Sequence, residues 1–295
     1  MDKFKTVEIS DKKWIENILK KTKNPSLEYN FTTLFIWQEI YNTKVREYKN
    51  CLLVRFGKER NVFLFPAGTE NIKAAVDFIL EENKDRYVCI GGIVEEQKVF
   101  LEKNYPGVFD YTEDRDMSDY IYTTESLTTL KGKKLSSKRN HINRFVENYP
   151  QWSYEEISKK NIDEVTDMHE EWCGIMKESG KSGLEEEGMA VRKALKYYKE
   201  LELQGGAIRA DGNIIAFELG DELNEQTFLV HIEKAFAHIQ GAYPMINKQF
   251  VIHNCQNYKY VDREEDTGDE GLRRAKLSYN PCIILKKYNA VKNEY

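Results

Sequence analysis

The sequence predicts an α/β protein with mixed sheets, organised in two domains. Its 295 residues are enough for two domains of ordinary size. Segments with apolar residues at every third or fourth position alternate with short apolar or alternating runs, a pattern typical of helices interleaved with strands. No low-complexity segment or long linker interrupts this order. We therefore expect two compact domains joined directly.

Composition excludes several classes of protein. Hydrophobic residues make up 41% and charged residues 32% of the chain, the proportions of a globular protein. A net charge of −5 argues against binding nucleic acid over the whole surface. No stretch approaches the ~20 apolar residues of a membrane span, and the first residues lack the apolar core of a secretory signal. Five scattered cysteines without CxxC spacing predict neither disulfides nor a metal site, and we expect a cytoplasmic protein.

The first half combines helices with short strands. A helix follows Asp11, and Ser26 is the predicted cap of a second helix that ends near Trp37. Gly57–Asn61 is a turn signal between the two strands of a hairpin. The further predicted elements are strands at 51–56, 62–65, 87–90 and 120–123 and helices at 72–82 and 95–103.

The second half has longer helices and a meander of strands. Asp211-Gly212 predicts a tight turn in the meander, and Asp221–Gln226 predicts a polar loop. Pro281 lies between the last helix and the last strand, consistent with its missing N–H donor. The predicted elements are strands at 152–156, 207–209, 214–219, 227–232, 258–261 and 282–288 and helices at 135–147, 162–177, 189–203, 243–254 and 272–277.

The order of elements in the second half is that of a GNAT acyltransferase domain: two helices, an antiparallel meander, a helix, a strand, a short helix and a strand. The first half offers a shorter version of the same order. We therefore predict tandem GNAT-like acyltransferase domains that arose by duplication. The N-terminal domain is assigned to residues 1–128 and the C-terminal domain to residues 129–295, because residues 125–133 are polar and weakly patterned.

A charged segment follows the strand at 258–261, at the end of a strand where α/β folds tend to bind ligands. Gly268 and Gly271 permit a tight turn, and two cations on the next helix lie three residues apart on one face. Carboxylates here would hold a substrate ammonium, and cations would bind phosphate, carboxylate or an oxyanion. A solvated charged turn explains the same pattern. The charged residues are Asp262, Arg263, Glu264, Asp266, Arg273 and Lys276.

YVDREEDTGDEGLRRAKLSYNP, from residue 260, and HIEKAFAHIQGAYPMINKQF, from residue 231, resemble the C-terminal domain of bacterial phosphatidylglycerol lysyltransferases. SLEYNFTTLFIWQ, from residue 26, and LKGKKLSSKRNHINRF, from residue 130, are similar to the soluble stand-alone proteins of that family. The resemblance implies a tandem GNAT-like fold and transfer of an aminoacyl group from a charged tRNA. Characterised membrane members transfer this group to a lipid headgroup. This chain has no membrane-spanning portion, so a lipid acceptor is not implied.

Residues 131–144 concentrate positive charge in an otherwise acidic protein. Seven of these fourteen residues are Lys, Arg or His, which favours a contact with phosphate of tRNA or of a cosubstrate. A surface helix with outward cations, packed through Leu135, Ile142 and Phe145, is the alternative, and both can hold. The residues assigned to phosphate or RNA binding are Lys134, Lys138, Arg139, Arg144 and, from a separate loop, Gly241.

That loop corresponds to the pyrophosphate loop Q/R-x-x-G-x-G/A with which acyl-CoA-dependent GNATs bind phosphate at a helix N-terminus. Gly241 is present, but His238 and Tyr243 replace the first and last residues of the pattern. This weakens an acyl-CoA interpretation without removing it. Tyr243 and Asn247 lie four apart on the next helix and are candidates for a general acid and its orienting partner. A partly buried Tyr and a surface Asn are the alternative.

His231 and Glu233 are expected to point to the same side of their strand, beside a substrate amine. A His that is simply hydrogen-bonded within the core is the alternative for His231. Glu218, on the neighbouring strand, is a candidate of the same kind.

These residues favour a transferase that moves an acyl or aminoacyl group to an amine or hydroxyl acceptor. No Cys or Ser lies in a nucleophile motif, so direct attack by the acceptor is expected. We expect no metal and no tightly bound cofactor. Aminoacyl-tRNA is the favoured cosubstrate and acyl-CoA the alternative, with tRNA and a small-molecule or headgroup acceptor as partners. A non-catalytic GNAT-like module that binds a ligand or RNA is the third interpretation.

Overall fold

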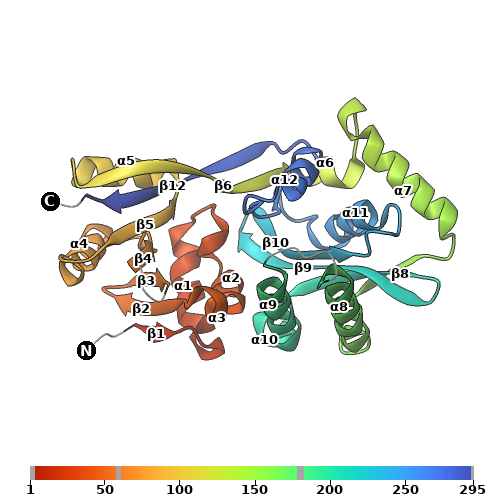
Figure 1. The fold of residues 1–295 in the computed structure, drawn as a ribbon, viewed down its shortest axis with the longest axis horizontal. Helices are drawn as coiled ribbons and strands as arrows, with labels where there is room; N and C mark the ends of the chain where they lie inside the picture. Colours follow the sequence, from red (N-terminus) through yellow and green to blue (C-terminus); the bar gives the residue numbers. More distant parts are fainter. Residues whose placement is uncertain (1–3, 58–60, 178–182, 294–295) are drawn as a thin grey trace. The chain divides into compact units, whose positions relative to one another are not determined.

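The computed structural model describes residues 4–57, 61–177 and 183–293 (Figure 1). The chain forms two compact units. Unit 1 comprises Met1–Asp119, Glu265–Asp269 and Ile284–Tyr295, and unit 2 comprises Tyr120–Glu264 and Glu270–Ile283. Two segments of the second half of the chain thus belong to the first unit. The assignment of residues 1–128 and 129–295 to two domains that arose by duplication stays a prediction.

Unit 1 has a mixed sheet in the order β1-β2-β3-β4-β5-β12-β6. Strands β2, β3 and β4 are antiparallel neighbours, β4 and β5 are parallel, and β12 is antiparallel to β5. The strands are β1 (Lys5–Thr6), β2 (Lys44–Tyr48), β3 (Cys51–Phe56), β4 (Asn61–Leu64), β5 (Val88–Ile93), β6 (Phe109–Thr123), which passes into unit 2 after Asp119, and β12 (Ile283–Lys292). The helices are α1 (Lys12–Thr22), α2 (Phe31–Ile36), α3 (Gln38–Tyr41), α4 (Ile72–Glu82) and α5 (Glu95–Asn104).

The core of unit 1 forms where α4 and α5 pack on the sheet. Val76 of α4 and Leu101 of α5 are fully buried in one apolar cluster with Ile90 of β5. Ala290 of β12 belongs to the same cluster. A strand from the far end of the sequence therefore completes the core of the first unit.

The cap of α2 differs from the prediction. The side chain of Asn30 accepts a hydrogen bond from the Thr33 N–H at 3.1 Å, whereas Ser26 precedes a 3₁₀ helix, Leu27–Tyr29. Ser26 was therefore the wrong cap, because its hydroxyl donates to Glu28 instead. The strand β2 was not predicted, and part of the expected Gly57–Asn61 turn lies outside the described residues.

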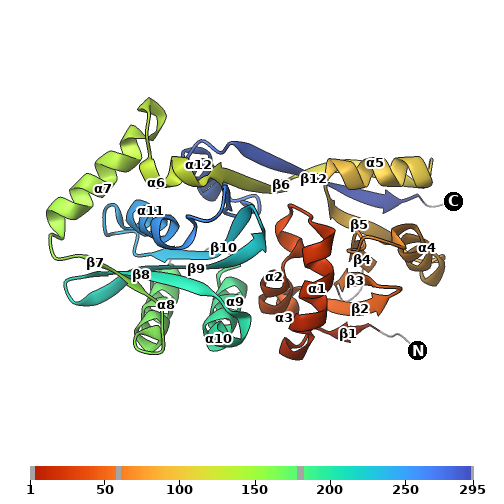
Figure 2. The same cartoon turned by 180° about the vertical axis from the view of Figure 1, so that it is seen from behind.

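Unit 2 has the strand order β6-β11-β10-β9-β8-β7, antiparallel except for the parallel pair β10 and β11. Helix α11 lies on one face of β8, β9 and β10, and α8 and α9 lie on the other (Figure 1, Figure 2). The strands are β7 (Ser153–Glu156), β8 (Gln204–Ala210), β9 (Asn213–Asn224), β10 (Thr227–Ala235) and β11 (Tyr260–Asp262). The helices are α6 (Thr124–Thr129), α7 (Ser136–Asn148), α8 (Ile162–Lys177), α9 (Leu184–Lys196), α10 (Tyr198–Leu201), α11 (Ala242–Asn254) and α12 (Glu270–Leu277).

The turn between β8 and β9 is confirmed, since Asp211 and Gly212 both have positive φ, 49° and 83°. The polar loop predicted at Asp221–Gln226 was wrong. Strand β9 continues to Asn224 because β10 pairs with it from Thr227 onward. The predicted helix at 189–203 is two helices, α9 and α10.

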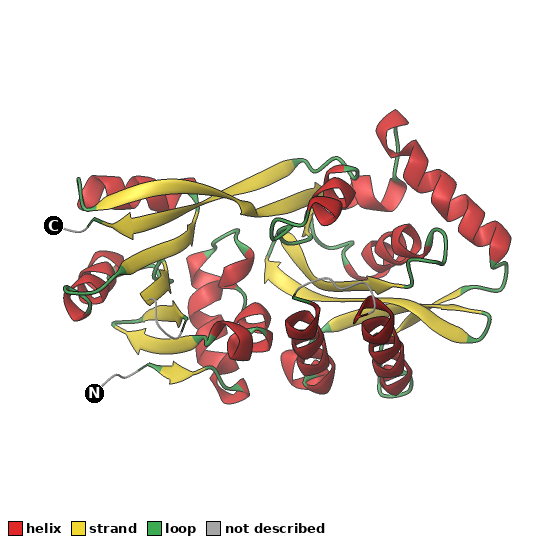
Figure 3. Cartoon of the chain, viewed as in Figure 1, coloured by secondary structure: helices red, strands yellow, loops and turns green. Residues whose placement is uncertain are grey.

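Helices and strands alternate through both units, as Figure 3 shows, and the α/β class with mixed sheets is confirmed. Among the described residues, none of the helices has the length and apolarity that a bilayer span requires.

Candidate functional site

Strands β10 and β11 part after three paired residues. Their parallel pairing ends at Leu229 and Asp262, whereas β10 continues to Ala235 alongside β9. Arg263 follows β11 at once, and its Nη2 binds Glu233 Oε2 at 2.6 Å. The end of β11 therefore brings a cation to β10 just beyond the point where the strands separate, a common place for ligands in α/β sheets.

Arg263 is the centre of this site. Its side chain is 9% exposed, and its Cζ lies 4.5 Å from the ring centre of Tyr279 and 5.6 Å from that of Tyr122. Burial, the largest influence, acts to lower the pKa of Arg263, but Glu233 and the other acidic groups around it together raise the pKa. Its Nη1 is buried and makes no hydrogen bond to a described residue. The guanidinium is thus charged, lies beside two aromatic rings, and has a donor to offer to a ligand.

Glu218 of β9 lies directly opposite Glu233 of β10 in the sheet. Burial raises the pKa of Glu218 well above its ordinary value and Glu233 adds to the rise, while Arg263 and the Asn247 amide act against it. Asn247 of α11 is buried rather than at the surface. No hydrogen bond joins its amide to Glu218, although the amide lies close enough to affect the pKa of Glu218. The site therefore holds a protonated carboxyl group next to the carboxylate that pairs with Arg263.

Lys138 is the member of the basic segment that joins this cluster. Its Nζ lies 4.1 Å from the ring centre of Tyr279, on the ring that also contacts Arg263. Burial lowers the pKa of Lys138, the positive charge of Arg263 lowers it further, and Glu233 opposes both. A half-buried lysine thus brings a second cation to the site.

The other cations of the segment have different surroundings. Lys134 donates to the Asn280 side chain at 2.9 Å. Arg139 donates to the carbonyl oxygens of Leu130 and Gly132 and so fixes the chain after α6. Arg144 is exposed. Of the four cations of this segment that were predicted to bind phosphate, the structure therefore brings Lys138 to the cluster around Arg263.

His231 lies at a β-bulge in β10, and the extra residue breaks the alternation from which a shared side with Glu233 was expected. Its side chain is 1% exposed and is held between Asp221, 3.0 Å from Nε2, and Glu264, 3.1 Å from Nδ1. Burial, the largest influence, acts to lower the pKa of His231, but the two carboxylates together raise it to about 10. The imidazole is therefore protonated at neutral pH and is not available as a base.

The stability of unit 2 is expected to fall as His231 titrates. The pKa of His231 is raised on folding from about 6.5 to about 10. Its stabilisation is therefore complete below pH ~6.5 and is lost as the pH rises through ~10. Urea unfolding at pH 6, 8 and 10 should show a smaller decline in His231→Gln than in wild type. His238→Gln, which alters an exposed histidine, should decline as wild type does. Equal declines in all three proteins would contradict the assignment.

The predicted carboxylates divide between the two units. Asp262 is buried, and its Oδ1 accepts the N–H of Glu264 at 2.8 Å, which supports the left-handed backbone of Glu264, φ 58°. Asp266 and Gly268 belong to unit 1, where Asp266 Oδ1 accepts the Gly268 N–H at 3.0 Å and Asp266 Oδ2 pairs with Arg115 at 3.6 Å. Asp262 and Glu264 thus flank Arg263, whereas Asp266 has partners within unit 1. Among the described residues, no cluster of His, Cys, Asp and Glu has the arrangement of a metal site.

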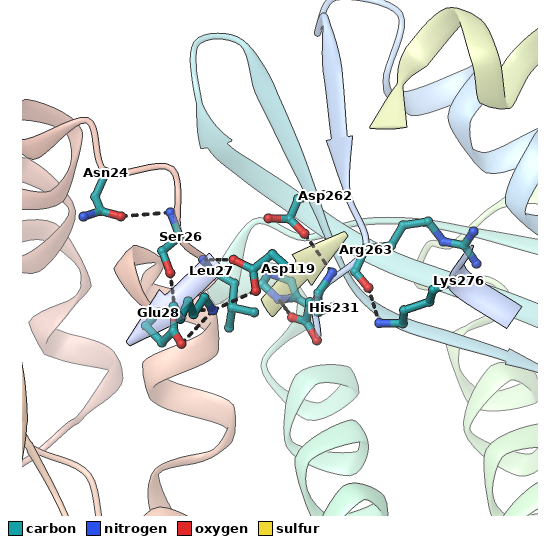
Figure 4. A network of polar contacts seen from close by, with 11 residues as sticks. Asn24, Ser26, Leu27, Glu28, Asp119, His231, Asp262, Arg263 and Lys276 are labelled. Carbon is teal, nitrogen blue, oxygen red and sulfur yellow. Dashed lines mark hydrogen bonds and ion pairs between the residues drawn. The ribbon is translucent and has the colours of Figure 1, made fainter. Parts of the chain in front are cut away.

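Helix α12 contributes through Lys276. Its Nζ donates to the carbonyl oxygen of Arg263, and its own carbonyl oxygen accepts the Tyr122 hydroxyl at 2.7 Å. Lys276 therefore fixes the backbone of Arg263, which makes it a positioning residue (Figure 4). Arg273 is half-buried on the same helix, and Gly271 is exposed in its first turn.

Gly241 is the N-cap residue of α11, and Tyr243 lies in the first turn of the helix. Burial raises the pKa of Tyr243 and Glu233 adds to the rise, while hydrogen bonds to Trp172 and the backbone of Ala235 oppose it. The phenol is therefore protonated, as a general acid requires. Gly241 has φ 89°, and a Cβ there would lie 2.3 Å from the carbonyl oxygen of His141 in α7. Close packing of α7 against α11 thus accounts for this glycine without a bound phosphate.

Gly241→Ala is expected to destabilise the protein by about 3 kcal/mol, because overpacking against a backbone oxygen adds to the strain of positive φ. Gly132→Ala is the matched control, since Gly132 has φ 92° and nothing lies within 4 Å of its added Cβ. The control should cost only about 1 kcal/mol. Chemical denaturation measures both values. Equal losses would show that packing on α7 is not the constraint.

Sequence reasoning missed a buried cluster in unit 1. Lys287 of β12 binds Glu28 at 2.8 Å to each carboxylate oxygen and Asp119 of β6 at 2.7 Å. Asp119 also accepts the Leu27 N–H at 3.3 Å, and Ser26 donates to Glu28 (Figure 4). Burial acts to lower the pKa of Lys287, but the surrounding carboxylates raise it. Lys287 pairs with both carboxylates of this cluster, so we assign the cluster to structure.

Comparisons with known proteins bear on the whole chain. A sequence model of the family described as phosphatidylglycerol lysyltransferase, C-terminal, matches residues 20–291. A conserved protein of unknown function from Bacteroides thetaiotaomicron has 37% sequence identity and a TM-score of 0.94, over 99% of this chain and all of that one. L-PGS from Bacillus licheniformis has 17% identity and a TM-score of 0.68, over 96% of this chain and 92% of that one. The predicted tandem GNAT-like fold is confirmed.

A curated relative gives a shorter match. An uncharacterised protein of Mycoplasmoides gallisepticum is 27% identical over a 180-residue alignment that covers 58% of this chain and 55% of the relative. The chain spans about half the length of this relative. Because the family match extends over nearly all of the 295 residues, the chain belongs to the family of phosphatidylglycerol lysyltransferase C-terminal domains.

Proposed function

We propose that this protein transfers an aminoacyl group from a charged tRNA to an amine or hydroxyl acceptor. The observation that carries the proposal is the cluster where β10 and β11 part, in which the cation Arg263 lies among the carboxyl groups of Glu233 and Glu218. This combination suits a substrate that has an amino group next to a polarised carbonyl. Membership of a lysyltransferase family supports the same reaction class.

The reaction is an ester aminolysis or transesterification. The acceptor nitrogen or oxygen attacks the carbonyl carbon of the aminoacyl ester, the bond to the ribose oxygen of tRNA breaks, and the proton of the acceptor passes to that oxygen. Arg263 Nη1 and Lys138 would stabilise the negative charge that develops on the carbonyl oxygen. Glu233, whose side chain is 15% exposed, is placed to accept the proton, and Tyr243, the protonated phenol, to return one.

Residues outside the cluster hold Arg263 in position or could contact the tRNA. Lys276 holds the backbone of Arg263, and Asp262 shapes the turn that follows. Exposed Arg144 of α7 offers a contact for tRNA phosphate at the surface. No contact in this proposal requires a bound cofactor.

Transfer assays with separately charged tRNAs test the proposal. The purified protein is incubated with each radiolabelled aminoacyl-tRNA and with amine and hydroxyl acceptors, including phosphatidylglycerol vesicles. Enzyme-dependent movement of label from tRNA to an acceptor is the expected result. A parallel assay supplies acetyl-CoA and the same acceptors and measures released thiol. Thiol release without aminoacyl transfer would overturn the proposal in favour of an acyl-CoA-dependent N-acyltransferase, and binding of tRNA without any transfer would favour a non-catalytic module.

A further inference from the structure

Two buried polar side chains of unit 2 lack the hydrogen bonds that such groups normally make. Glu218 is fully buried and Asn247 is 1% exposed. Neither carboxyl oxygen of Glu218 and neither amide atom of Asn247 makes a hydrogen bond to a described residue. More than nine-tenths of buried polar groups in folded proteins have a partner, so these four atoms point to a bound molecule.

A third group of this kind lies beside them. Arg263 Nη1 is buried and likewise makes no hydrogen bond within the described residues. The charges of Arg263 and Glu218 influence each other's pKa, and Glu233, opposite Glu218, binds Arg263 directly. The donors and acceptors without partners are therefore gathered at one place, on the face of the sheet that α11 covers.

The neighbouring strand β8 has a glycine, and so no side chain, at the position paired with Glu218. Gly206 of β8 pairs with Glu218, and a Cβ on Gly206 would lie 2.0 Å from the Tyr154 hydroxyl. The Tyr154 hydroxyl accepts a hydrogen bond from Asn254 at 2.7 Å rather than bonding to Glu218. The position next to Glu218 is thus closed by Tyr154 on one side and bordered by Arg263 on the other.

The atoms of Glu218, Asn247 and Arg263 that lack hydrogen-bond partners define the chemistry of a ligand. Protonated Glu218 accepts a hydrogen bond at one oxygen and donates one from its hydroxyl. The Asn247 oxygen accepts, while Arg263 Nη1 and the Asn247 nitrogen donate. An α-amino group supplies several N–H donors, and the carbonyl oxygen on the adjacent carbon accepts from a guanidinium. An acetyl group has no N–H donor and would leave the acceptor oxygens of Glu218 and Asn247 unpaired.

We propose that Glu218 and Asn247 form the subsite for the free α-amino group of the aminoacyl substrate, with Arg263 on its carbonyl oxygen. This inference rests on the proposed aminoacyl transfer and adds a requirement to it. The donor must have an unblocked α-amino group, so an Nα-acetylated aminoacyl-tRNA is a poor substrate even when its side chain and tRNA are unchanged.

The test compares transfer from an aminoacyl-tRNA with transfer from the same aminoacyl-tRNA after chemical Nα-acetylation. Wild-type protein should show a kcat/KM at least ~30-fold lower for the acetylated donor, about 2 kcal/mol. Glu218→Gln should slow transfer from the free donor and reduce this preference to a few-fold. Glu222→Gln, the same change at an exposed position of β9, should keep the preference. Equal transfer from both donors by wild type would refute the subsite and leave the proposed function intact.

A binding measurement keeps the two proposals separable. Calorimetry with L-amino acid amides and their Nα-acetyl derivatives tests the subsite without tRNA or acceptor. Preferential binding of the free amides, lost in Glu218→Gln, would support the subsite even if no transfer were detected. If wild type binds both kinds of amide alike, or neither, the groups without partners are met by ordered water and the inference fails.

Discussion

Replacing Lys287 with Met is expected to lower the free energy of unfolding by about 3–5 kcal/mol, because the change leaves buried carboxylates without their cation. Lys287 is fully buried and binds both Glu28 and Asp119. Burial acts against the charge of Lys287, yet the carboxylates raise its pKa above the unfolded value of ~10.4. Its contribution is therefore complete at neutral pH and is lost only in strongly alkaline solution. The destabilisation should be nearly constant between pH 7 and 9.

Lys286→Met is the matched control, one residue away on the same strand. The Lys286 side chain is 60% exposed and pairs with Glu113 at 3.0 Å, so its loss should cost less than about 1 kcal/mol. Urea unfolding followed by circular dichroism gives both values. Similar losses in the two variants would mean that the buried pairs of Lys287 contribute no more than a surface ion pair.

Arg263→Lys is expected to reduce kcat/KM for aminoacyl transfer by about 100-fold, the usual effect of losing one donor to a developing oxyanion. Lysine keeps the charge beside Glu233 but loses the planar fork, the second donor Nη1 and the stacking on Tyr279. The charge that remains should keep the loss of stability smaller than the loss of activity.

Arg274→Lys, the same substitution at an exposed position of α12, is the control for this variant and should retain wild-type kinetics. Steady-state transfer assays and thermal unfolding are measured on both proteins. If Arg263→Lys transferred at the wild-type rate, Arg263 would be a structural residue and the oxyanion would need another donor.

Local patterns predicted the regular elements and part of the candidate site. The limits of helices α4 and α8 match the predicted 72–82 and 162–177, because apolar periodicity and charged flanks are properties of nearby residues. The segment after β11 was identified for the same reason, since its charges stand together in the sequence. Arg263 and Lys138 were named from these runs of charge, and the structure places them on the same tyrosine ring.

Features that depend on distant residues were not predicted. Asp266 follows Arg263 by three positions but lies in the other unit, and no local pattern marks that division. Lys287 and Lys286 are alike in sequence, yet one is buried and the other exposed, because burial depends on the strands on either side of β12. The bulge at His231 likewise became visible only through its pairing with β9.

The place of β12 in unit 1 has a consequence for synthesis on the ribosome. β12 lies between β5 and β6, so these strands cannot be joined through it until residues 283–292 have left the exit tunnel. The residues of unit 2 from Tyr120 to Glu264 emerge before then. Until β12 arrives, the nascent chain exposes two unpaired strand edges, which favour association with other chains. The unit whose translation begins first is therefore the last to be completed.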